Sequence, residues 1–164
     1  MKPVKILIID DEPVIRKGCA VTLADGNHAV DACATGKAGM EAIKKGEYDV
    51  LLLDMKLPDM EGMDILKKIR KSNPGIYPIV MTGYSTVQNA VEAMKSGAFD
   101  YLTKPFTDDE LLFVVTIIHH LILCRPDFPF FNAVCLGWLQ CFPSKEVLSF
   151  KFLHEYFTPA VSYG

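Results

Sequence analysis

The chain has 164 residues, the length of one domain or of one domain with an appendage. Half of its residues are hydrophobic and 23% are charged, which excludes disorder over the whole chain. The net charge of -3 argues against a nucleic-acid-binding module that works through a general positive field.

Short apolar runs alternate with amphipathic segments along residues 1–120, which predicts alternating strands and helices. Turn signals separate them, such as Asp25-Gly26-Asn27 and Asn73-Pro74-Gly75. In chain order, the predicted elements are strand 4–9, helix 12–24, strand 29–34, helix 36–45, strand 50–53, helix 61–71, strand 76–81, a helix that ends at Gly97, strand 99–102 and a fifth helix after Thr107.

Two capping boxes predict where the last two helices begin. They pair Ser85 with Gln88 and Thr107 with Glu110. Behind the first box, Val87, Val91 and Met94 have helical spacing and predict the apolar stripe of an amphipathic helix.

The alternation of strands and helices with short connections predicts an α/β fold, in which helices cover both faces of a parallel sheet. The strand at 50–53 is apolar throughout, as a strand covered on both faces should be. In such doubly wound sheets, functional residues gather at the carboxyl ends of the strands.

Polar residues lie at the ends of four predicted strands. They are Asp10, Asp11 and Glu12 after the first, Asp54 after the third, Thr82 after the fourth, and Tyr101 and Lys104 on and after the fifth. Carboxylates that converge on one rim repel one another, and a hard divalent cation such as Mg²⁺ relieves that repulsion. Taken singly, each residue could be an ordinary cap, turn or surface residue. Their shared rim favours a cation site, with Lys104 as a fixed positive charge on its other side.

Four motifs occur in order: ILIIDDE at 6–12, VLLLDMKLPDMEGMDIL at 50–66, IVMTGYS at 79–85 and GAFDYLTKPF at 97–106. With them, residues 3–118 resemble the receiver domain of two-component response regulators. The expected fold is then a flavodoxin-like (βα)₅ doubly wound parallel sheet with strand order 2-1-3-4-5. The stretch 82–106 looks most like receivers of the nitrogen-regulator type, which usually precede an ATPase domain that activates sigma-54 polymerase.

The resemblance implies catalytic and metal-binding roles. Asp54 matches the phosphoacceptor, and Lys104 matches the lysine that holds a phosphoryl oxygen. The implied Mg²⁺ ligands are Asp11 and Asp54, the backbone carbonyl of Lys56, and Asp10 acting through water.

The resemblance also implies a conformational switch. Thr82, whose hydroxyl belongs to the catalytic set, and Tyr101 match the switch pair. Lys56 and Tyr84 match positions that flank the phosphoryl group and tune its lifetime. The peptide bond that precedes Pro105 is expected to be cis.

The function expected from this resemblance is a phosphorylation-dependent signalling switch, and not an enzyme beyond its own phosphorylation and dephosphorylation. The phosphodonor would be a sensor histidine kinase. Phosphorylation of Asp54 would change the face made by the fourth helix, fifth strand and fifth helix. An output partner, expected to act in transcription, would read that face, and two copies could dimerise through it.

The cysteine content and the start of the chain predict a cytoplasmic location. Five cysteines are an odd number without CxxC spacing, which suits a reducing compartment. No secretory signal precedes the first strand, and the apolar run 111–124 is too short to span a bilayer. No membrane contact and no direct nucleic-acid binding are expected.

A shift in composition near residue 120 predicts a receiver domain over 1–120 and a separate tail over 121–164. The tail has three acids, three bases and ten of the 17 aromatic residues. Two hypotheses remain for it: an accessory helical hairpin, or a non-native or truncated output region, with the second preferred. A metal site at His119-His120 is disfavoured, because adjacent helical residues point in different directions.

Two other functions are weighed against the receiver. A haloacid-dehalogenase-like Mg²⁺-dependent phosphohydrolase also uses an Asp at a strand end, but it needs a second Asp where this chain has Lys56. A flavodoxin-like electron carrier needs a phosphate-binding loop after the first strand, where Asp10 and Asp11 would repel the flavin phosphate.

Overall fold

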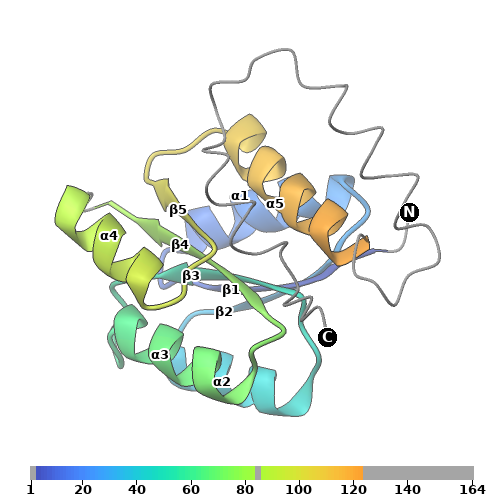
Figure 1. Ribbon diagram of the computed structural model, residues 1–164. Coiled ribbons are helices and arrows are strands. Elements are labelled where there is room, and N and C mark those ends of the chain that lie inside the picture. Colours follow the sequence, from blue (N-terminus) through green and yellow to red (C-terminus); the bar gives the residue numbers. More distant parts are fainter. Residues whose placement is uncertain (1–2, 84–85, 124–164) are drawn as a thin grey trace, which may run out of the picture. The chain divides into compact units, whose positions relative to one another are not determined.

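The computed structural model describes residues 3–83 and 86–123 (Figure 1). Strands and helices alternate strictly along this part of the chain. The strands are β1 (Lys5–Ile9), β2 (Ala29–Cys33), β3 (Val50–Asp54), β4 (Tyr77–Thr82) and β5 (Asp100–Thr103). The helices are α1 (Pro13–Asp25), α2 (Gly36–Lys45), α3 (Gly62–Ser72), α4 (Val87–Lys95) and α5 (Asp108–Leu123).

All five strands are parallel and lie in the order β2-β1-β3-β4-β5, which confirms the predicted fold class. Chain order reverses beside β1: the chain moves from β1 to the edge strand β2 and then back to β3 on the other side. The carboxyl ends of β1 and β3 are therefore neighbours at the switch point, where α/β sheets bind ligands.

Helices cover both faces of the sheet (Figure 1). Alternate strand residues, such as Leu7, Ile9 and Leu53, share a buried cluster with residues of α2, α3 and α4. The strand residues between them are also buried, on the face where Figure 1 shows α1 and α5. This double cover explains why β3 is apolar and fully buried along its whole length.

The predicted start of α4 is wrong by one residue. The N-cap is Thr86, whose hydroxyl accepts a hydrogen bond from the backbone N–H of Asn89 at 3.2 Å. Ser85 itself lies outside the described residues. The box at α5 is confirmed: Thr107 N–H donates to Glu110 Oε2 at 2.8 Å, and Glu110 N–H donates to Thr107 Oγ1 at 3.2 Å.

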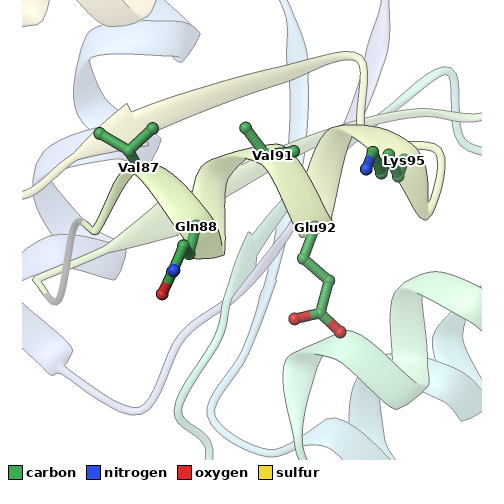
Figure 2. Close-up of a pocket in the computed structure, with 5 residues that line it drawn as sticks. All are labelled: Val87, Gln88, Val91, Glu92 and Lys95. Atoms are coloured by element: carbon green, nitrogen blue, oxygen red, sulfur yellow. The ribbon is translucent and has the colours of Figure 1, made fainter.

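The predicted apolar stripe of α4 faces the core only in part. Ala93 is buried and Met94 packs against the core cluster, but Val87 and Val91 are 82% and 46% exposed. Figure 2 shows these two valines along α4 in a shallow hollow that also involves Gln88, Glu92 and Lys95. The sequence pattern located the helix correctly but did not identify which of its apolar residues are covered.

Three predictions lie partly or wholly outside the described residues: those for Tyr84, for Ser85, and for the segment 124–164 with its aromatic residues and hypothetical output role. The part of the chain that the structure describes contains no helix long and apolar enough to cross a membrane.

Candidate functional site

The side chains predicted to form a site come from the carboxyl ends of neighbouring strands. Asp10 directly follows β1, Asp54 is the last residue of β3 and Thr82 the last of β4. All three are buried, with exposed fractions of 0%, 6% and 4%. Lys104 follows β5, and its backbone N–H donates to the carbonyl of Thr82 at 2.8 Å. The peptide bond between Lys104 and Pro105 is cis.

Lys104 is the centre of this site. Its Nζ lies 2.7 Å from Asp10 Oδ2, 2.8 Å from Asp54 Oδ2 and 2.9 Å from Glu12 Oε1. It donates hydrogen bonds to Asp54 and Glu12. Burial opposes the charge of the ammonium group, but the three carboxylates outweigh burial and raise the pKa of Lys104 above its usual value.

Asp10 is the most deeply buried of the three acids. Burial raises the pKa of its carboxyl group, and the nearby Lys104 charge counteracts this only in part. Its Oδ1 accepts a hydrogen bond from the backbone N–H of Glu12 at 2.8 Å, while its buried Oδ2 lies 2.7 Å from Lys104 Nζ. Both oxygens of this buried carboxylate are therefore held by polar partners.

Glu12, and not Asp11, completes the acidic cluster in this conformation. Carboxylate oxygens of Asp10, Glu12 and Asp54 lie within 4.8 Å of one another, and this is the one group of potential metal ligands among the described residues. Asp11 is exposed on the loop between them. The run of acidic residues after the first strand correctly indicated where the cluster lies. Which of these side chains point into the cluster depends on the backbone conformation of the loop.

The donor set fits a hard divalent cation. It consists of carboxylate oxygens, and the groups of Asp10 and Asp54 are buried. An incomplete oxygen cage of this kind suits Mg²⁺, which keeps several waters. Asp10 and Asp54 are the buried members that would hold it. Like charges within 4.8 Å of one another also need a positive partner, which Lys104 supplies in this structure.

The loop after Asp54 is held in a compact form. The Lys56 N–H donates to Asp54 Oδ1 at 3.2 Å, and Lys56 pairs with Glu61 in an isolated antiparallel bridge. A Cβ on Gly62 would lie 2.4 Å from the carbonyl oxygen of Asp54, so only glycine fits there. The chain beside the carboxylate is thereby kept close to β3.

Asp59, which the sequence did not single out, ties this loop to the start of α2. Its carboxylate accepts hydrogen bonds from the backbone N–H groups of Gly36 at 2.8 Å and Lys37 at 2.9 Å. These hydrogen bonds lower the pKa of Asp59, and the bond from the Lys37 N–H has the largest effect. The carboxylate also lies at the positive end of the α2 dipole, so the contact stabilises both segments.

Thr82 is the last residue of β4, and Tyr101 lies on the neighbouring strand β5, two residues before Thr103, which pairs with Thr82. The hydroxyl of Tyr101 is buried, and burial raises its pKa, while the nearby Thr82 side chain acts in the opposite direction. The Thr82 side chain is therefore close enough to influence the buried hydroxyl of Tyr101.

His119 is buried between two other histidine rings. Its ring packs edge-to-face on His28, with ring centroids 5.5 Å apart, and its centroid lies 6.2 Å from that of His120. The sequence did not reveal the contact between His28 and His119, because these two histidines are far apart in the chain and meet only through the fold.

Comparisons with known proteins agree with this geometry. Residues 6–116 match the family model described as the response regulator receiver domain. The chain is 33% identical over 111 residues to the probable transcriptional regulatory protein TcrX of Mycobacterium tuberculosis, covering 68% of this chain and 47% of that protein. It is 36% identical over 111 residues to the regulatory protein AtoC of Escherichia coli, covering 68% of this chain and 24% of that protein.

Among solved structures, the fold is similar to a CheY-like response regulator receiver domain protein from Methanospirillum hungatei. The TM-score is 0.68 at 34% identity, and the match covers 71% of this chain and 93% of that one. The chain spans about half the length of the first curated relatives that it matches.

Proposed function

The chain belongs to the response regulator receiver domain family, and on this premise we propose that it is a phosphorylation-dependent switch of a two-component signalling system. Asp54 accepts a phosphoryl group from a sensor histidine kinase. The receiver domain extends over residues 1–120, and its output acts in transcription, as the names of its relatives indicate for those proteins.

The observation that carries this proposal is the Asp54 carboxylate held 2.8 Å from Lys104, beside the buried Asp10. One oxygen of Asp54 forms the new bond to phosphorus, while the bond from phosphorus to the donor imidazole nitrogen breaks and leaves its electron pair on that nitrogen. Lys104 binds an oxygen of the transferred group. Asp11, Asp54 and the Lys56 carbonyl, with Asp10 through water, would hold Mg²⁺, which would supply charge neutralisation between the two anions.

The transferred group adds roughly two negative charges and three strong hydrogen-bond acceptors at Asp54. The Thr82 hydroxyl donates to one of them, which draws the end of β4 towards the site. Tyr101, whose hydroxyl is buried in this structure, takes up the space that Thr82 vacates. Phosphorylation thus shifts a pre-existing equilibrium in the face made by α4, β5 and α5. Lys56 and Tyr84, two positions after Asp54 and Thr82 in the sequence, are proposed to tune the lifetime of the group.

That face is also the proposed surface for an output partner or a second copy of the chain. Val87 and Val91 expose apolar area on it, and Gln88 and Glu92 extend from the other side of α4 (Figure 2). We further propose a cytoplasmic location, no membrane contact and no direct nucleic-acid binding. The stretch 82–106 supports a receiver of the nitrogen-regulator type, and residues 121–164 are proposed to be a separate tail, a non-native or truncated output region.

Intact-mass measurement after incubation with a small acyl phosphate and Mg²⁺ tests the proposal. Wild-type protein should gain one phosphoryl group, and Asp54→Ala should gain none. Asp64→Ala, in the first turn of α3, is a control that should behave as wild type. Absence of the adduct in wild-type protein that binds Mg²⁺ would contradict the proposal.

Two further results separate the alternatives. Thr82→Ala should still take up the phosphoryl group but lose the change in the α4-β5-α5 face, seen as amide chemical-shift changes. Continuous release of phosphate from a phosphate ester would instead support the haloacid-dehalogenase-like phosphohydrolase. Lys56 disfavours that enzyme, because it stands where the general acid would be needed.

A further inference from the structure

Glu12 occupies the N-cap position of α1, but its side chain does not cap the helix. It makes no hydrogen bond to the first turn, where Ser, Thr, Asp or Asn would be the usual caps. Pro13 follows at the first helical position and has no N–H that needs a partner. Glu12 Oε1 instead accepts a hydrogen bond from Lys104, which lies 92 residues further along the chain.

The three acids around Lys104 differ in their exposure. The side chains of Asp10 and Asp54 are 0% and 8% exposed, whereas that of Glu12 is 57% exposed. Lys104 therefore has two buried partners on its inner side and one partner on its solvent side. The hydrogen bond from the Glu12 N–H to Asp10 Oδ1 fixes the backbone from which the Glu12 side chain extends.

A divalent cation at this site competes with Lys104. The ammonium group contacts Asp10 Oδ2 and Asp54 Oδ2, which belong to the two buried carboxylates of the candidate cation site. Two cations repel each other at such distances, so Lys104 must give up part of its contact with the inner pair when the divalent ion binds. Glu12 is the partner that remains on the outer side.

We propose that Glu12 is a positioning residue for Lys104. It keeps the ammonium group at the rim of the site, facing the phosphoryl group, after a divalent cation has taken the buried carboxylates. A lysine side chain is long, flexible and strongly hydrated, so without this anchor it would spend most of its time in solvent. This inference rests on the proposed function, and it adds a residue to which the motif comparison gave no role.

The direct test observes the Lys104 ammonium group by ¹H–¹⁵N NMR, because a salt bridge slows its exchange with water enough for detection. Lys104→Arg identifies the signal by removing it. In wild-type protein, the signal should persist at saturating Mg²⁺. In Glu12→Gln it should be present without Mg²⁺ and disappear when Mg²⁺ is added. Glu41→Gln, which removes the same charge from an exposed pair on α2, should match wild type.

Kinetics provide the second readout. At saturating Mg²⁺, Glu12→Gln should lower the rate of phosphorylation by an acyl phosphate about fivefold. The Mg²⁺ dissociation constant from calorimetry should change less than about threefold. In a Lys104→Met background, Glu12→Gln should have no further effect on rate, because the residue acts through Lys104.

Three outcomes would overturn the inference: a Lys104 signal lost from wild-type protein on Mg²⁺ addition, a signal retained in Mg²⁺-saturated Glu12→Gln, or a loss of Mg²⁺ affinity of about tenfold or more in that variant. The last would make Glu12 a metal ligand. Wild-type protein that binds Mg²⁺ without taking up a phosphoryl group would refute the proposed function alone, and the NMR comparison would still decide the role of Glu12.

Discussion

Replacing Lys104 by methionine should destabilise the protein strongly, because it removes the ammonium group that contacts all three acids of the cluster. Methionine keeps the length and the apolar stem of the side chain but leaves Asp10 and Asp54 buried next to each other. Both carboxylates lose an ion pair of 2.7–2.8 Å. Glu12, which is largely exposed, loses a partner but can turn to water.

The size of the effect follows from the distances. At an effective dielectric constant of about 20, each lysine–carboxylate pair contributes about 6 kcal/mol of attraction, and each pair of carboxylates within 4.8 Å contributes about 3 kcal/mol or more of repulsion. Protonation of one acid limits the penalty, so we expect a loss of about 3 kcal/mol, the lower end for a broken buried pair. For a domain of this size, that is a decrease in Tm of about 10 °C.

The loss should depend on pH. Burial already raises the pKa of Asp10, and removal of Lys104 takes away an influence that lowers it. A carboxyl group whose pKa is raised by folding adds stability at low pH and loses it as the pH rises through the folded-state pKa. The variant should therefore be closest to wild type near pH 5 and furthest from it near pH 8. Mg²⁺ should restore part of the difference.

Urea denaturation followed by circular dichroism at several pH values measures this effect. Lys45→Met is the control, because Lys45 forms an exposed pair with Glu41 at 3.6 Å and should change stability by less than about 0.5 kcal/mol. A Lys104→Met protein as stable as wild type at pH 8, or a loss that is the same at pH 5, would refute the reasoning.

Three further variants test other parts of the structure. Gly62→Ala places a Cβ 2.4 Å from the Asp54 carbonyl oxygen, so it should cost about 1–3 kcal/mol in urea denaturation and lower the phosphorylation rate; unchanged values would show that the loop adapts. His28→Phe should reduce the loss of stability on acidification from pH 7 to pH 5, because burial and His119 lower the pKa of His28 and the unfolded chain binds the proton more readily. If the variant lost as much stability between pH 7 and pH 5 as wild type, His28 would be excluded as a cause of that loss. Thr107→Ala removes the cap of α5 and should cost about 1 kcal/mol, seen as a Tm lower by about 4 °C, and no change in Tm would contradict the cap assignment.

The directions of side chains in the loops could not be predicted from the sequence pattern. Asp10, Asp11 and Glu12 are adjacent acids, and nothing in their order shows that Asp11 turns to solvent while Glu12 contacts Lys104. Asp59 is of a residue type common in turns, yet its carboxylate accepts hydrogen bonds from two backbone N–H groups of α2. Side-chain direction in a loop depends on backbone angles and on partners that are distant in the chain, and neither is encoded in local periodicity.

The exposed face of α4 shows the same limit. Helical spacing correctly placed Val87 and Val91 on a helix, but burial depends on how the helix axis lies against β5 and the rest of the sheet. The structure covers Ala93 and leaves both valines in contact with solvent. The contact between His28 and His119 likewise exists only because the turn before β2 and the last turns of α5 meet in the folded chain.

The sequence by itself determined the order and type of the elements, because buried parallel strands need continuous apolar runs and the helices that cover them need amphipathic ones. It also determined which strand ends carry the acids and the lysine. The tertiary structure decided which side chains meet at Lys104. The ion pairs link Asp10, Glu12 and Asp54 to a residue 50 to 94 positions away, and such contacts form only when the sheet brings the strand ends together.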